Sequence, residues 1–217
     1  MTTQTISGLP SFPDTPIARR ALALVRETES TATANHSIRA WLFARLRADH
    51  EGAAPGRDYD PGLLFLACVL HDIGLTEAGD RHQRFEVDGA DTAAEFLTAQ
   101  GLPAPDVDAV WEAIALHTSP GIAERRGPLC ALVHKGTGMD FGLGTECVDD
   151  ATGARIHAAY PRLSMATTLT DEIVAQARRR PEKAPHFTIA AELLRERSTP
   201  PHTTRMEINA DAGRWGN

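Results

Sequence analysis

The sequence lacks any apolar run that approaches the ~20 residues a membrane-spanning helix needs, and it lacks an excess of basic residues. Its 22 lysines and arginines are outnumbered by 29 aspartates and glutamates, which gives a formal charge of −7. Nucleic acids and anionic membranes both bind basic surfaces. We therefore expect neither of them as a partner.

Cysteine is also scarce. Cys68, Cys130 and Cys147 are odd in number, widely spaced and without a CxxC pattern, as is typical of free thiols in a reducing compartment. The polar N-terminal stretch MTTQTISGLPSFPDTP has neither the basic nor the apolar region of a signal peptide. Together these features predict a cytoplasmic protein.

No segment shows the alternation of a β-strand, and there is no P-loop, GxGxxG or GxSxG motif. Apolar residues at helical spacing predict an all-α bundle in one domain, residues 14–197. We expect a flexible segment at 1–13, a loop at 142–161 and an irregular or disordered tail at 198–217. The predicted helices lie near 15–29, 31–50, 61–71, 86–100, 106–117, 128–140, 163–180 and 186–197.

The most informative stretch is LLFLACVLHDIGLT, residues 63–76. Its apolar run predicts a buried helix, so His71 and Asp72 at its end lie in or beside the core. Burying such groups without partners costs roughly 2–7 kcal/mol for a polar group and more for a charge. Two interpretations remain open here: a bound metal cation, or a hydrogen bond between His71 and Asp72 at a helix end.

Three other ionisable residues occupy similar positions. His36 lies on the apolar side of its predicted helix, where it is either a satisfied core histidine or a ligand. His117 ends one helix, and Asp140 ends another that is unusually rich in glycine for a helix. Two imidazoles and two carboxylates make a plausible site for a divalent metal, although their long spacing leaves the site to tertiary folding.

The order His36, His71-Asp72, Asp140 resembles the HD-domain superfamily, an all-α fold whose members bind metals with an H…HD…D pattern. The resemblance covers roughly residues 17–175 and is greatest to the cyanamide-hydratase-like branch. The local matches are NHSIRAW (35–41), FLACVLHDIGLT (65–76), RFEVDGADTAAEFL (84–97), AIALHT (113–118), GTGMDFG (136–142) and AAYPR (158–162).

The resemblance implies one zinc ion per chain, with iron or manganese as alternatives, held by His36, His71, Asp72 and Asp140. Two departures from family patterns support a single metal and a small neutral substrate. Phe85 stands where many two-metal HD enzymes have a histidine, and Leu75-Thr76 stand where phosphohydrolases often have a lysine. We therefore expect the partner to be a small-molecule substrate. The resemblance alone suggests that the protein forms a homodimer.

The implied activity is that of a zinc-dependent hydro-lyase, in which hydroxide formed at the metal adds to a small nitrile such as cyanamide to give urea. Asp72 would steer the water's proton, His117 would donate a proton to nitrogen, and Thr76 would orient the substrate. For His117 the alternative is a cation at a helix C-terminus, and for Thr76 it is a surface-loop residue. The alternative activity is metal-dependent phosphohydrolysis of a nucleotide or another phosphate ester.

Overall fold

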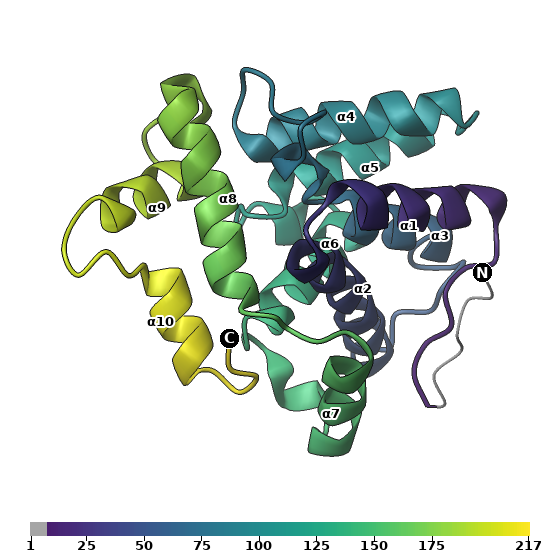
Figure 1. The fold of residues 1–217 in the computed structure, drawn as a ribbon. Helices are drawn as coiled ribbons and strands as arrows, with labels where there is room; N and C mark the ends of the chain where they lie inside the picture. Colours follow the sequence, from purple (N-terminus) through teal and green to yellow (C-terminus); the bar gives the residue numbers. More distant parts are fainter. Residues whose placement is uncertain (1–7) are drawn as a thin grey trace.

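The computed structural model describes residues 8–217 and folds them into helices without a β-strand (Figure 1). The prediction of an all-α bundle is confirmed. The α-helices of the described residues are α1 Pro16–Thr28, α2 Thr31–His50, α3 Pro61–Leu70, α4 Phe85–Ala99, α5 Ala104–Leu116, α6 Pro128–Asp140, α7 Asp150–Ala159, α8 Met165–Arg179, α9 Ile189–Arg197 and α10 Arg205–Ala212. Four 3-10 turns accompany them: η1 Ile73–Leu75, η2 Ala123–Arg125, η3 Thr145–Cys147 and η4 Pro181–Lys183.

Helix α3 forms the centre of the core. Asp60 caps its N-terminus by accepting from the backbone N–H groups of Gly62 and Leu63. All residues from Leu64 to Leu70 are buried, and α3 packs against α1, α2, α5 and α6. Because α3 is apolar on every side, the core surrounds it, and its C-terminal end delivers His71 and Asp72 into the interior.

Helices α2 and α6 approach each other at Gly136. A Cβ atom at this position would lie 2.4 Å from the carbonyl oxygen of Ala40 and 2.7 Å from the Cβ of Ala44. The glycine-rich segment is helical as far as Asp140. Because Gly136 has no Cβ atom, the backbone of α6 can lie directly against α2. This contact places the end of α6 beside His36 on α2.

A second close approach positions the start of α4 against the HD pair. A Cβ atom at Gly74 would lie 2.0 Å from the carbonyl oxygen of Phe85, and one at Gly89 would lie 3.0 Å from the backbone nitrogen of Gly74. The two glycines thus allow backbone-to-backbone packing of η1 against α4. As a result Phe85 lies next to the end of α3.

Two predictions about the later part of the chain are wrong. The expected loop at 142–161 contains α7, which Asp149 caps and which buries Ile156. The expected irregular tail contains α10, where Thr204 and Glu207 form a capping box. The spacing Thr-x-x-Glu is a sequence signature of a helix start, so the signal for α10 was present.

The two ends of the described chain also pack on the bundle. Phe12 lies 4.9 Å from the ring of Trp41, so residues 8–13 do not form the predicted flexible segment, while residues 1–7 lie outside the described residues. Trp215 stacks 5.7 Å from the ring of Phe43 and donates to the carbonyl of Met139. Aromatic burial ties both ends to the core, so the tail from Ser198 belongs to the same packed unit.

Helices α8, α9 and α10 form a layer along one side of the bundle, coloured green to yellow (Figure 1). Helix α8 contacts α2, α9 and α10. Cys68, Cys130 and Cys147 are free cysteines, as predicted. Within residues 8–217, no helix combines the length and apolarity that crossing a membrane requires.

Candidate metal centre

Three of the predicted ligands converge on one point. His36 comes from the second turn of α2, and His71 and Asp72 follow α3 directly. Each offers a donor atom, and these three atoms lie within 4.8 Å of one another. All three side chains are buried, which is the arrangement that a bound divalent cation would stabilise.

The hydrogen bonds of the imidazoles direct one nitrogen of each ring toward this point. His71, the C-cap residue of α3, donates from Nδ1 to the carbonyl of Cys68 at 2.7 Å. His36 donates from Nδ1 to Oδ2 of Asp140 at 2.6 Å. Each Nε2 therefore carries a lone pair, and the two Nε2 atoms are 3.2 Å apart. Two lone pairs at this distance repel each other unless a proton or a cation lies between them.

The Asp72 carboxylate completes the set of donors. Its Oδ2 lies 3.2 Å from Nε2 of His71 and 3.7 Å from Nε2 of His36. Burial would raise the pKa of Asp72, but attraction to His71 and the neighbouring histidines holds it well below its usual value. Burial likewise opposes protonation of His71, yet Asp72 raises its pKa. The same negative potential that favours a proton here favours a divalent cation, so the residues fit a metal.

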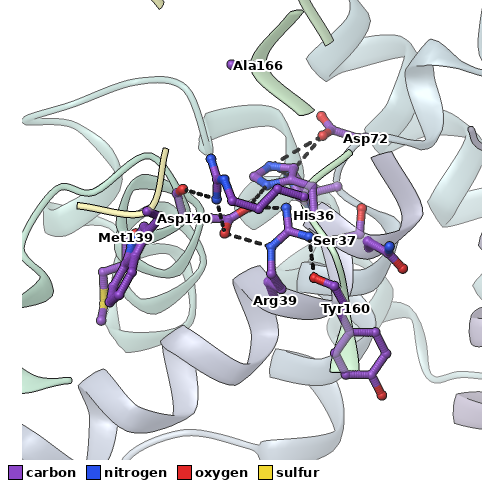
Figure 2. Close-up of polar contacts among 12 residues, drawn as sticks. His36, Ser37, Arg39, Asp72, Met139, Asp140, Tyr160 and Ala166 are labelled. Carbon is purple, nitrogen blue, oxygen red and sulfur yellow. Dashed lines mark hydrogen bonds and ion pairs between the residues drawn. The ribbon is translucent and has the colours of Figure 1, made fainter. Parts of the chain in front are cut away.

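Asp140 lies on the other side of the His36 ring (Figure 2). Both of its oxygens accept from the Arg39 guanidinium at 2.8 Å, and Oδ1 also accepts from Arg162 at 3.0 Å. Burial would raise the pKa of the Asp140 carboxyl, but Arg39 and the adjacent histidines hold it well below its usual value. In this conformation Asp140 contacts the site through His36, and its role as a direct ligand stays a prediction.

Arg39 is the anchor of this network. It is fully buried on α2, one turn after His36, and its Nη1 donates to the carbonyls of Tyr160 and Pro161 at 2.9 and 3.1 Å (Figure 2). A buried guanidinium whose three nitrogens all donate hydrogen bonds fixes the carboxylate it pairs with. Sequence reasoning missed Arg39, although an arginine one turn after a candidate ligand on a buried helix face is a detectable signal.

His117 joins the site, as the sequence predicted. It is the C-cap residue of α5 and, like His71, donates from Nδ1 to the carbonyl three residues earlier, that of Ile114, at 2.7 Å. Its Nε2 lies 3.8 Å from Oδ1 of Asp72, and its ring is 4.8 Å from that of His71. Burial, followed by repulsion from His71, lowers the pKa of His117 to about 4. The ring is therefore neutral at neutral pH, which does not fit the alternative of a cation at a helix C-terminus.

Thr76 is not brought to the site. Its hydroxyl donates to the carbonyl of Ile73 at 2.7 Å and accepts from the N–H of Gly79 at 3.3 Å, so it stabilises the turn after the HD pair. Thr76 also does not line the cavity described below. Because both hydrogen-bonding functions of this hydroxyl serve the backbone, the geometry does not support the expected role of Thr76 in orienting the substrate.

A cavity of about 270 Å³ opens over the histidines and Asp72. Its polar lining includes Thr137, whose buried Oγ1 has no hydrogen-bond partner. Phe85 also lines the cavity, with its ring 5.8 Å from that of His117. Sequence reasoning missed Thr137, since a lone threonine between two glycines carries no pattern of its own.

Comparison with known proteins agrees with this geometry. Two curated relatives, the cyanamide hydratases DDI2 and DDI3 of Saccharomyces cerevisiae, are each 26% identical over 176 residues, covering 78% of this chain and 76% of the relative. A family model described as HD domain matches residues 33–177, more than half of the chain, and this range contains His36, His71, Asp72, His117 and Asp140. The chain therefore belongs to the HD-domain family.

Proposed function

We propose that the protein is a metal-dependent hydratase that adds water across the carbon–nitrogen triple bond of a small nitrile such as cyanamide, which would give urea. The observation that carries the proposal is the convergence of two Nε2 lone pairs and the Asp72 carboxylate on the floor of a cavity. Similarity to proteins named cyanamide hydratases supports the choice of reaction within the family.

His36, His71 and Asp72 would hold the ion directly, and Asp140 would orient His36. Two imidazoles and a carboxylate are a common zinc ligand set, and iron and manganese accept the same donors. We propose zinc, one ion per chain. When bound, such an ion supplies Lewis acidity, which lowers the pKa of water to about 7.

The residues around this point would manage the protons. His117 is neutral and points Nε2 toward Asp72, so it can accept a proton from the attacking water and return it to the substrate nitrogen. Asp72 Oδ1, on the side of His117, can steer that proton. The oxygen of water then ends on carbon and both of its protons on nitrogen, which gives the amide without an oxidant.

Thr137 is the group we propose for holding the substrate nitrogen. Its hydroxyl is buried in the cavity wall without a partner, and an unpaired buried hydroxyl costs about 1–3 kcal/mol. A hydrogen bond to the developing negative charge on nitrogen would recover that cost and lower the barrier. Thr137 thus takes the role that the sequence had suggested for Thr76.

The cavity lining argues against the phosphohydrolase alternative. Among the described residues that line it, none is a lysine or arginine, although phosphate esters are bound by cationic side chains and metals. Phe85, in the position of a second-metal histidine, presents a hydrocarbon ring to the cavity. A neutral substrate and a single ion suit this environment better.

The test is urea formation from cyanamide by purified zinc-loaded protein. We expect turnover in the wild type and none in His71→Ala. His82→Ala is the matched control, because the His82 side chain is 83% exposed and remote from the ligand group, so it should keep full activity. Protein that holds metal, is inert to cyanamide and simple nitriles, and releases phosphate from mononucleotides would instead be a phosphohydrolase.

A further inference from the structure

The cavity over the metal centre is much larger than cyanamide. Cyanamide has three non-hydrogen atoms and would take about 90 Å³ at roughly 30 Å³ per atom, the volume share of a water molecule in the liquid. The cavity measures about 270 Å³. Room for about six further atoms of the same size therefore remains beyond the reacting group.

The wall that surrounds this extra space is hydrocarbon. Leu169 and Ile173 of α8, Ile189 of α9 and Met206 of α10 line the cavity, together with Phe85 and Phe141, which pack in the same apolar clusters. Cyanamide would gain little from such a wall, because its amino group seeks hydrogen-bond acceptors. An apolar group would displace water from it, and apolar burial is favourable at about 25 cal/mol per Å².

The part of the wall from α9 and α10 is a built element of the fold. Arg197 at the end of α9 donates to both oxygens of Glu207 on α10 at 3.0 Å and to Asp171 on α8 at 2.7 Å. Met206 also packs between the small apolar clusters of α8, α9 and α10. These contacts hold the three helices together over the metal centre, so the apolar space has fixed walls.

We infer that the substrate of this site is a nitrile with an apolar substituent of about four to six non-hydrogen atoms, which lies against α8, α9 and α10 while the C≡N group faces the histidines. The inference rests on the proposed hydratase activity and specifies its substrate class. The reaction is R–C≡N plus water giving R–C(=O)–NH₂: the two π bonds of C≡N and the two O–H bonds of water break, a C=O double bond and two N–H bonds form, and no redox partner is needed.

The experiment compares alkyl nitriles of equal electrophilicity, from acetonitrile through propionitrile and butyronitrile to pentanenitrile, with the zinc-loaded protein. We expect kcat/KM to rise about fourfold with each added methylene, the equivalent of about 0.8 kcal/mol per buried CH₂ group. Pentanenitrile would then exceed acetonitrile by roughly 60-fold. Calorimetry gives a readout without turnover: pentanamide should bind more tightly than acetamide, with a negative heat-capacity change.

A variant locates the substituent. Met206→Trp fills the apolar space, so the ratio of kcat/KM for pentanenitrile to kcat/KM for cyanamide should fall at least about tenfold. Ile208→Trp is the matched control on the same helix, because Ile208 is 48% exposed and does not line the cavity. It should leave the rates for both substrates unchanged, and the circular dichroism spectrum of each variant reports that it is folded.

The outcomes separate the two levels of the proposal. A rising series that Met206→Trp flattens supports the inference. Cyanamide turnover combined with a flat or falling alkyl series overturns the inference and leaves the hydratase activity standing. Inertness toward every nitrile overturns the hydratase proposal, and this inference with it.

Discussion

Replacing Arg39 tests whether the buried network behind His36 controls the metal centre. Arg39 is fully buried, makes two parallel bonds to Asp140 at 2.8 Å and two further bonds to the carbonyls of Tyr160 and Pro161. Arg39→Met removes the guanidinium and leaves the Asp140 carboxylate in the interior with Arg162, His36 and His157. Breaking a buried pair from one side costs about 3–5 kcal/mol, which we expect as the loss in the free energy of unfolding.

The effect on metal binding should be separate from the loss of stability. Because Asp140 fixes the tautomer and orientation of His36, losing its anchor should weaken zinc affinity about 10–100-fold. Arg39→Lys keeps the charge but cannot make two parallel bonds, so it should lie between wild type and Arg39→Met in both measurements. Urea denaturation of the chelator-treated protein gives the stability, and competition with a zinc chelator gives the affinity.

Arg47→Met is the control on the same helix. Arg47 pairs with Glu51 and Glu146 at a partly exposed position, where its side chain is 21% exposed. Its loss should cost at most about 1 kcal/mol and leave zinc affinity unchanged. If Arg39→Met unfolds more easily but binds zinc as tightly as wild type, the network serves the fold alone and our account of Asp140 is refuted.

Three further predictions concern other parts of the structure. Burial, reinforced by neighbouring carboxylates, raises the pKa of Glu29 well above 4.5, so the unfolded chain ionises first and stability falls as pH rises from 4.5 through the folded pKa. In denaturant titrations Glu29→Gln should therefore match wild type near pH 4 and exceed it at pH 8; a difference independent of pH would refute this. Gly136→Ala should destabilise the protein by the ~1–3 kcal/mol that overpacking against α2 costs, which would appear as a lower melting temperature. Gly138→Ala should be neutral or stabilising, because its Cβ would lie 3.7 Å from its nearest neighbour. Equal effects of the two substitutions on the melting temperature would contradict the close approach of α6 to α2. Thr137→Val should lower kcat for cyanamide about 10–1000-fold with little change in zinc affinity, and unaltered kcat would remove Thr137 from the mechanism.

Local patterns sufficed for most of the fold. The apolar run before His71 predicted a buried helix, and α3 is that helix. The position of His36 on an apolar face favoured a core histidine and left a ligand open, and the structure places it against both Asp140 and the HD pair. Patterns failed where tertiary contacts stabilise a weak helix: α7 and α10 have little apolar periodicity and are held by Trp215 and Arg197.

The convergence of His36, His71 and Asp72 was predictable from the sequence, and the surroundings of these residues were less so. The sequence pointed to His71 and Asp72, because polar residues at the end of a buried helix need partners in the core. The pKa of His117 could not be foreseen, since it depends on burial that only the packed structure defines. Likewise, the unpaired hydroxyl of Thr137 and the saturated hydroxyl of Thr76 are properties of the three-dimensional arrangement of neighbours.

The most direct test of the central claim is the metal content of the purified protein by elemental analysis. The account predicts about one zinc per chain in the wild type and in His82→Ala, and loss of that zinc in His71→Ala. Two metal ions per chain, or a His71→Ala variant that retains its zinc, would contradict a single centre built on His36, His71 and Asp72.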